Sequence, residues 1–109
     1  METEDQLDAV FFALSDRRRR QLLAELAAGP CAVSALAATL HLKLSATSKH
    51  IAALEAADLL FKTRRGREVY CHLNFDVWRK VAGYIAMHAK FWAGRLDELE
   101  TYLKEAGAE

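Results

Sequence analysis

The sequence is poor in the residues that interrupt or cross-link a chain. Its 109 residues include one proline and two cysteines. Two cysteines are too few for a disulfide-stabilised fold and are typical of a protein in a reducing compartment. The acidic first eight residues lack the basic start and apolar core of a signal peptide, and no run of about 18 uncharged apolar residues occurs. We therefore expect a cytoplasmic protein that does not enter a membrane.

The remaining composition is that of a folded domain with a basic centre. Hydrophobic residues make up 52% of the chain and charged residues 28%, and the formal net charge is zero. This length and composition fit a single domain over residues 1–109. Residues 1–16 carry five acidic and no basic residues, whereas residues 41–72 carry six Lys or Arg against three Asp or Glu. Such a distribution indicates a protein that contacts phosphate on one face.

Hydrophobic periodicity predicts three helices before residue 41. The first covers about residues 5–15, and Asp16 is a suitable N-cap for the second. We expect Gly29 to end the second helix as a left-handed cap, with Pro30 preventing its continuation. The third helix is short and covers residues 33–40.

A fourth helix is predicted over residues 44–58, with two different faces. Its apolar stripe, expected to face the core, consists of Leu44, Thr47, Ile51 and Leu54. The opposite face is small and polar with one cation, and consists of Ser45, Ala46, Ser48, Lys49 and Ala52. Asp58 is one of the few non-glycine residue types that tolerate a left-handed cap, so we expect the helix to end there.

Residues 60–73 change to the two-residue period of a β-hairpin. Residues 68–73 alternate between polar and apolar, which predicts a half-buried strand paired with residues 61–64. Gly66 supplies the positive φ that the turn after Arg65 requires.

The order of these elements is that of a winged helix-turn-helix, a mainly α fold with a small β-hairpin. The helices over 33–40 and 44–58, joined by residues 41–43, form the turn motif. In such a unit the second helix, the recognition helix, enters the major groove of double-stranded DNA, and the hairpin, or wing, contacts flanking phosphates. Because one domain offers few contacts, we expect a dimer on a two-fold operator.

Three motifs, in the same order, resemble those of the ArsR/SmtB family. The segment SKHIAAL at 48–54 resembles the S-R/K-H-L-x-x-L core of the family's recognition helix. The segment DRRRRQLL at 16–23 is similar to the family's D-x-x-R-x-x-I-L segment. The segment RRGREVY at 64–70 resembles the family's R-x-G-R-x-V-Y wing. The resemblance covers roughly residues 8–73. It implies a homodimeric winged-helix repressor whose dimer contacts come from the first and last helices. The C-terminal aromatic pattern resembles a branch of the family that does not sense metals.

Two departures from the family pattern affect the recognition helix. Lys43 stands where the family usually has an N-capping serine, so we expect the helix start to shift to Ser45. Asp58 replaces the usual glycine after the helix. Neither change removes a DNA contact, and the Lys43 ammonium adds a cation that we expect to contact a phosphate of the DNA backbone.

The residues expected to bind DNA lie in the fourth helix and the hairpin. They are Lys43, Ser45, Ala46, Ser48, Lys49, His50, Arg64, Arg65 and Arg67. A merely solvated face is the alternative for these residues, and for His50 a packed, hydrogen-bonded ring is an equal alternative. In the run 17–20, one or two arginines are expected to touch phosphate, with the others pairing with acids such as Asp8, Asp16 or Glu25.

Residues 75–105 form an uninterrupted helical pattern that fits either one long helix or two joined near Gly83 or Ala89. A monomer would expose its wide aromatic stripe to water, so we expect a homodimer. The expected interface residues are Leu7, Phe11, Trp78, Ile85, His88, Trp92, Leu96 and Leu99. The alternative, a pocket for a small-molecule inducer lined by the same aromatics, has no residue pattern in its favour.

No metal site, cofactor site or catalytic site is expected. The family's Cys-x-Cys pair is absent because Cys31 stands alone, and His88 lacks the partners of the last-helix metal motif. No Ser/His/Asp set or glycine-rich phosphate loop occurs. A redox switch between Cys31 and Cys71 would need Cα atoms within about 7 Å. We predict a sequence-specific DNA-binding repressor rather than an enzyme; the alternative is a winged-helix protein-interaction module.

Overall fold

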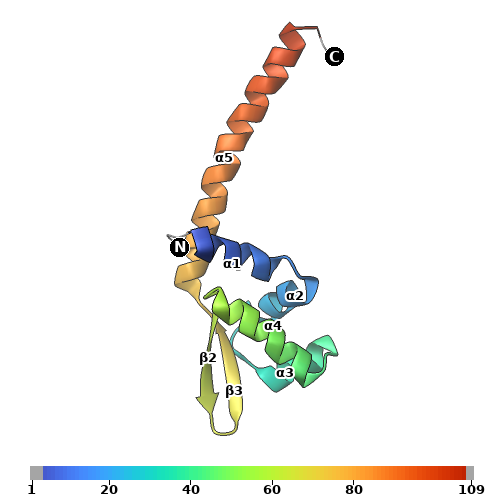
Figure 1. Ribbon diagram of the computed structural model, residues 1–109, viewed down its shortest axis with the longest axis vertical. Coiled ribbons are helices and arrows are strands. Elements are labelled where there is room, and N and C mark those ends of the chain that lie inside the picture. The colour runs from blue at the N-terminus through green and yellow to red at the C-terminus, as the bar shows by residue number, and fades with distance from the viewer. Residues whose placement is uncertain (1–3, 108–109) are drawn as a thin grey trace. The chain divides into compact units, whose positions relative to one another are not determined.

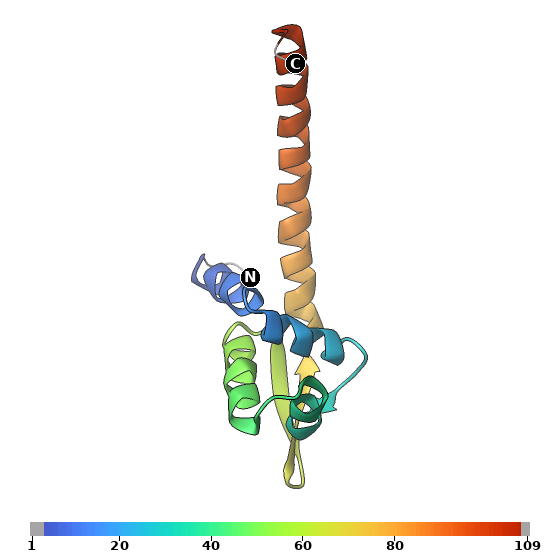
Figure 2. The ribbon, with the colours of Figure 1, turned by 90° about the vertical axis from the view of Figure 1, so that its right-hand side faces the viewer.

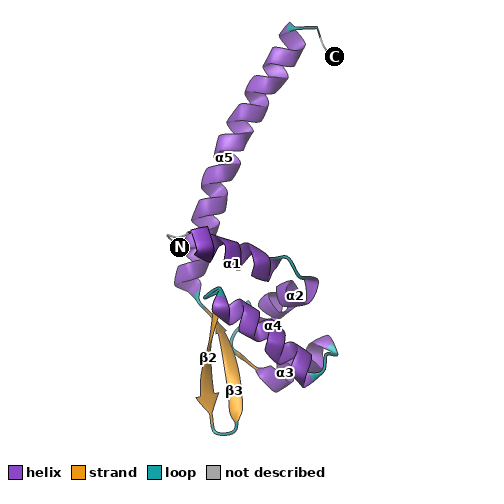
Figure 3. Cartoon of the chain, in the orientation of Figure 1, coloured by secondary structure: helices purple, strands orange, loops and turns teal. Residues whose placement is uncertain are grey.

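The computed structural model describes residues 4–107 and contains five helices and three strands among them (Figures 1 and 3). They are α1 (Glu4–Leu14), α2 (Arg17–Leu26), β1 (Cys31–Ala32), α3 (Val33–Leu40), α4 (Leu44–Ala56), β2 (Leu60–Arg65), β3 (Glu68–Leu73) and α5 (Phe75–Glu105). The chain forms two compact units, of which the first ends at Trp78 and the second begins at Arg79. The helix α5 is continuous, so the alternative with a break near Gly83 or Ala89 is wrong.

The start of α2 is as predicted, but its end is not. Asp16 has an extended backbone, and its carboxylate accepts hydrogen bonds from the backbone N–H groups of Arg18 (2.8 Å) and Arg19 (3.2 Å). These bonds satisfy amides that a helix leaves unpaired in its first turn. The helix ends at Leu26, before the Gly29-Pro30 pair, and Gly29 takes a φ of +143° in the following turn. Gly29 therefore shapes the turn but is not the left-handed cap of the helix.

The connection between α3 and α4 fixes where the recognition helix begins. His41 ends α3 in a left-handed conformation, and Leu42 N–H donates to the Ala37 carbonyl at 2.9 Å. Lys43 is the N-cap of α4 without a side-chain capping bond. Its carbonyl accepts hydrogen bonds from both the backbone N–H and the hydroxyl of Thr47, each at 3.0 Å. The helix thus begins at Leu44, which confirms the start of the predicted range 44–58, and no shift to Ser45 occurs because backbone bonds already start the helix.

The core of the first unit lies where α1 to α4 meet the sheet. Its largest fully buried side chains include Leu22, Leu36, Ile51 and Leu54. Thr47 is fully buried as predicted, since its hydroxyl is satisfied by the preceding turn. Leu44 is 57% exposed, so its predicted core position is wrong. The buried stripe of α4 begins one turn later than the periodicity indicated.

The end of α4 confirms Asp58 as a left-handed cap. The helix stops at Ala56, and Asp58 has a φ of +58°. Its N–H donates to the Glu55 carbonyl, and Leu59 N–H donates to the Leu54 carbonyl at 3.1 Å. These bonds turn the chain directly from the recognition helix into β2.

The sheet is antiparallel with strand order β1-β3-β2. Gly66, with a φ of +62°, makes the turn of the β2–β3 hairpin, as predicted. The strand β1 was not predicted, because two residues are too short to show an alternating pattern. It pairs with β3 so that Cys31 lies opposite Cys71 and Ala32 opposite Tyr70.

Candidate nucleic-acid interface

The outward face of α4 carries the short polar residues that the sequence singled out. Lys43, Ser45, Ser48 and Lys49 are exposed, whereas Ala46 and His50 are half-buried. Thr47, Ile51 and Leu54 occupy the opposite, buried side and fix the orientation of the helix. Small side chains on the exposed face let another molecule approach the helix closely.

The cations of this helix have no partner within the described chain. Neither the Lys43 nor the Lys49 ammonium forms a hydrogen bond or ion pair with any residue of 4–107. An unpaired ammonium on an exposed helix face remains available to an external anion.

His50 is half-buried, whereas Ser48 and Lys49 are exposed. The pKa of Asp16 is lowered chiefly by the hydrogen bond from Arg19 N–H, with smaller contributions from Arg18 N–H and the charges of His50 and Arg19. The His50 ring is thus close enough to Asp16 to influence it. Among the predicted contacts of α4, His50 is therefore placed less favourably than Ser48 and Lys49.

On one face of the hairpin, the side chains contact one another. The Phe61 and His72 rings stack with centroids 4.8 Å apart, and the Arg65 guanidinium lies 5.3 Å from the centre of the Tyr70 ring. The Tyr70 hydroxyl donates to a Glu68 carboxylate oxygen at 3.3 Å. The predicted DNA contact Arg65 is thus partly occupied by an intramolecular cation–π interaction.

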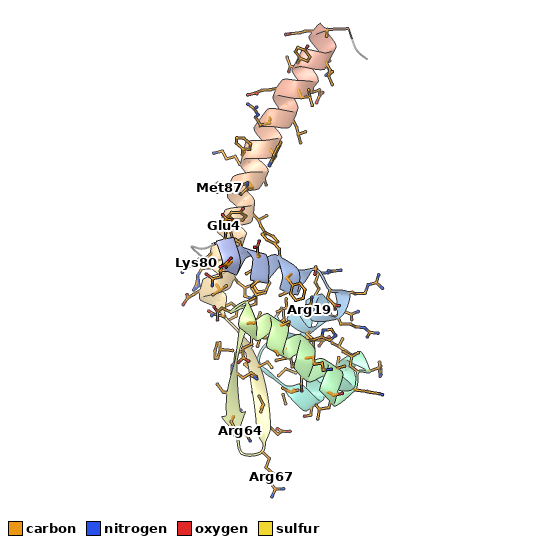
Figure 4. All side chains as sticks on the ribbon, viewed as in Figure 1. Glu4, Arg19, Arg64, Arg67, Lys80 and Met87 are labelled. Carbon is orange, nitrogen blue, oxygen red and sulfur yellow. The ribbon has the colours of Figure 1, made fainter. Side chains whose placement is uncertain are left out.

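The other two arginines of the wing are free. Neither Arg64 nor Arg67 forms a hydrogen bond, ion pair or ring contact within residues 4–107. Figure 4 shows Arg67 extending from the tip of the hairpin and Arg64 on β2 beside it. Both guanidinium groups are available to phosphate.

The recognition helix and the wing border one hollow. Both α3 and α4 lie against the hairpin, and Figure 2 shows them in front of it. Between these elements lies a hollow of about 460 Å³, lined by residues that include Ser34, Ser48, Lys62, Arg67 and Val69. The Lys62 ammonium, 3.1 Å from a Glu55 carboxylate oxygen, joins β2 to α4. The wing tip and the exposed face of α4 therefore flank the same concave surface.

Three arginines of the run 17–20 bond backbone carbonyls rather than the acids expected for them. Arg19 is buried, and its Nε and Nη2 donate to the carbonyls of Ala13 (2.7 Å) and Phe12 (2.8 Å), near the end of α1. Arg20 donates to the Leu14 carbonyl, and Arg18 donates to the Leu40 carbonyl at the end of α3.

The predicted ion pairs of this run with Asp8, Asp16 or Glu25 are therefore wrong. A helix end leaves up to four carbonyls unsatisfied, and these three arginines bond such carbonyls instead of acids. The position of the run, just after a predicted helix end, was the signal that could have indicated this role. Arg17 is exposed and has no partner within the described residues.

The second unit presents an apolar stripe. The exposed apolar residues of α5 include Ile85, Trp92, Leu96 and Leu99, which recur at helical spacing along one face. His88 is exposed and its ring packs against Tyr84, with centroids 4.4 Å apart. No helix within residues 4–107 has the combination of length and apolar character needed to span a membrane.

The predicted interface residues of the first unit are placed differently from one another. Phe11 is exposed in the single chain, as expected for a residue that packs against a second copy in a dimer. Leu7 is buried in its own chain, which corrects the expectation that it lies on a dimer surface. Trp78 is half-buried, and its indole N–H donates to the Leu59 carbonyl at 3.0 Å.

The described residues contain no cluster of three or more His, Cys, Asp or Glu that could hold a metal ion. Both cysteines are free thiols; Cys31 is half-buried and Cys71 is fully buried. Burial raises the pKa of the Cys71 thiol to about 11, although the Lys62 charge opposes this shift. The Cys71 thiol is thus protonated near neutral pH.

Comparison with known proteins places this arrangement in a family. A family model described as a helix-turn-helix domain matches residues 14–60. The chain is 30% identical to an ArsR-like transcriptional regulator from Rhodococcus sp. RHA1, over 93% of each chain and with a TM-score of 0.78. It is 31% identical to a homodimeric winged helix-turn-helix DNA-binding domain from Mycobacterium bovis, over 81% of this chain and 82% of that chain, with a TM-score of 0.66. It is 26% identical to NolR from Sinorhizobium fredii, over 76% of this chain and 83% of that chain, with a TM-score of 0.63. No curated protein sequence matches.

Proposed function

Because the chain belongs to the ArsR/SmtB family of DNA-binding winged helix-turn-helix transcriptional regulators, we propose that it is a homodimeric repressor that binds a two-fold operator. Proteins of this family are transcriptional regulators and not typically enzymes. The proposed regulator acts in the cytoplasm, with double-stranded DNA as its partner and without a cofactor.

The proposal is carried by one observation: the exposed face of α4 and the tip of the wing border the same hollow. Ser48 of α4 and Arg67 of the wing both line this hollow, and neither Arg67 nor the neighbouring Lys49 has a partner within residues 4–107. Cations without intramolecular partners on a concave surface are available to successive phosphates of a duplex.

In the proposed complex α4 enters the major groove. Ser48 and Lys49 contact base edges, Ser45 contacts the same region, and Ala46 contributes an apolar contact of the kind made with a thymine methyl group. Lys43 and His50 lie at the margins of this face and bind phosphate. The short side chains limit direct readout, so part of the sequence preference comes from the shape of the DNA.

The wing supplies contacts that do not depend on sequence. Arg64 and Arg67 bind phosphates beside the major groove or enter the adjacent minor groove, where a narrow groove attracts arginine. Arg65 contributes less, because its guanidinium already lies on the Tyr70 ring. The wing thereby holds α4 in register on the duplex.

The proposed dimer uses the exposed apolar stripe of α5, together with Phe11 of α1. Ile85, Trp92, Leu96 and Leu99 present an apolar surface that a single chain leaves in water. His88 lies on the same helix, and Trp78 supports the interface from its half-buried position. The Mycobacterium bovis relative is homodimeric. Two copies of α4 would then reach two half-sites about one helical turn of DNA apart.

The proposal is tested by selecting bound duplexes from genomic fragments and titrating the selected duplex against a scrambled one at two salt concentrations. A dimer by light scattering, a preferred sequence and affinity that falls with salt support the proposal. Binding that shows no preferred sequence and no salt dependence contradicts it and favours a protein-interaction module. In a reporter strain that carries the selected site in a promoter, deletion of the gene raises expression if the protein is a repressor.

A further inference from the structure

The three strands bring two thiols and an ammonium group into one cross-strand row. Cys31 on β1 lies opposite Cys71 on β3, and Lys62 on β2 lies opposite Cys71 from the other side. Opposed residues of an antiparallel pair point to the same face of the sheet, and their Cα atoms are about 4.5–5.5 Å apart. This spacing falls within the range of about 4.4–6.8 Å that a disulfide requires.

The two thiols differ in access to solvent. Cys31 is half-buried on a two-residue edge strand, whereas Cys71 is fully buried on the central strand beside it. A small oxidant therefore reaches Cys31 first. The charge of Lys62 favours the thiolate of Cys71, which counteracts part of the effect of burial on its pKa.

We propose that Cys31 and Cys71 form an oxidation site that reacts with hydroperoxides to give a reversible intrachain disulfide. The Cys31 thiolate attacks a peroxide oxygen, so that an S–O bond forms and the O–O bond breaks. With hydrogen peroxide, the departing hydroxide takes up the proton lost by Cys31 and leaves as water. Cys31 is then a sulfenic acid.

The buried thiol resolves this intermediate. The sulfur of Cys71 attacks the sulfur of Cys31, an S–S bond forms, and the S–O bond breaks. The released hydroxide combines with the proton of the Cys71 thiol to give a second water. Two thiols are thus oxidised by two electrons, and one hydrogen peroxide is reduced to two waters.

The location of the pair gives the disulfide a structural consequence. The strand β1 leads directly into α3, the first helix of the helix-turn-helix, while β3 is a strand of the wing. A Cys31–Cys71 bond would therefore hold the start of α3 to the wing covalently. The reaction concerns this chain alone and does not depend on the proposed operator.

The site is tested on the full-length protein without DNA. The wild type and the variants Cys31→Ser and Cys71→Ala are treated with equimolar hydrogen peroxide, denatured, labelled with N-ethylmaleimide and weighed by mass spectrometry. We expect the oxidised wild type to weigh two hydrogens less than the reduced protein and to take up no label. After reduction with dithiothreitol, the same protein should take up two labels. Trypsin should yield residues 21–43 joined to residues 68–79, the peptides that contain the two cysteines.

The variants separate the roles of the two thiols. Cys31→Ser should retain a labelled Cys71, because that thiol is buried. Cys71→Ala should stop at a sulfenic acid that dimedone captures; if this variant does not fold, the wild type and Cys31→Ser still test the proposal. Lys62→Met should slow disulfide formation several-fold. Two labels on peroxide-treated wild type, a disulfide between two chains, or direct oxidation to the sulfinic acid would overturn the proposal.

Discussion

Two arginine-rich segments of the first unit have similar composition and different roles. Residues 17–20 and residues 64–67 each contain at least three arginines, and both segments are basic by sequence alone. In the first, Arg18, Arg19 and Arg20 donate to carbonyls at or near helix ends. In the second, two of the three arginines have no partner within residues 4–107.

The difference follows from what surrounds each segment. The first segment begins a helix just after another has ended, so unsatisfied carbonyls lie within reach of its long side chains. The second surrounds the turn of a hairpin, where Arg64 and Arg65 lie in the ladder opposite Val69 and Glu68. The local density of arginine therefore does not show whether the guanidinium groups are already bonded to backbone carbonyls.

The largest effect expected from this comparison is on stability. Replacing Arg19 with Ala should lower the free energy of unfolding by about 2 kcal/mol, because the buried Ala13 carbonyl loses its charged donor and the part-buried Phe12 carbonyl loses one of its donors. Arg17→Ala is the matched control and should change it by less than about 0.5 kcal/mol, as expected for an exposed residue without a partner. Urea denaturation measures both, and equal losses in the two variants would remove the structural role of Arg19.

The next effect concerns sequence preference. Replacing Ser48 and Lys49 together with Ala should weaken binding to the selected duplex by about 2 kcal/mol, while binding to a scrambled duplex changes far less. Fluorescence anisotropy with both duplexes measures the difference, and light scattering checks that the dimer persists. Similar losses on both duplexes would mean that these residues bind phosphate rather than bases.

The direct comparison of the two arginine segments uses paired double variants. Arg64→Ala with Arg67→Ala should weaken binding to all sequences several-fold and reduce the slope of log affinity against log salt by about one for each phosphate that the variant no longer neutralises. Arg18→Ala with Arg20→Ala removes the same charge and should leave this slope unchanged. If the second pair flattens the slope and the first does not, the two segments have been assigned the wrong roles.

The smallest effect is a pH dependence at the start of α2. The pKa of Asp16 is lowered, chiefly by the hydrogen bond from Arg19 N–H, so the ionised cap stabilises the folded state above the unfolded pKa, near 3.8. This contribution is lost as the pH falls through the lower folded pKa. Asp16→Ala should therefore have a lower thermal midpoint than the wild type at neutral pH, and the two should converge in acid. Asp16→Asn, which keeps a capping oxygen, should show a smaller deficit at neutral pH, and a constant difference for Asp16→Ala across this range would contradict the capping role.

Features of the fold that depend on neighbouring residues could be predicted from the sequence. Asp16 as an N-cap, Asp58 as a left-handed cap and Gly66 in the turn are local choices, and the structure has all three. The exposed face of α4 followed from helical periodicity, although Leu44 was placed in the core because periodicity does not show where the core ends.

Features that depend on distant partners could not be predicted in this way. The strand β1 exists only because Cys31 and Ala32 meet β3 some forty residues further along the chain. The carbonyl partner of Arg18 is at Leu40, beyond the end of its own helix. Sequence spacing alone did not indicate either contact, so the Arg18–Leu40 hydrogen bond and the position of the two thiols required the structure.

In the proposed complex the exposed face of α4 and the tip of the wing form the DNA-binding surface, and the arginine run 17–20 lies outside it. Amide chemical-shift mapping of the isotope-labelled protein with the selected duplex tests it most directly. We predict that the shifts centre on residues 43–50 and 64–67, with little change at residues 17–20. Shifts centred on residues 17–20, with residues 43–50 unchanged, would contradict the account.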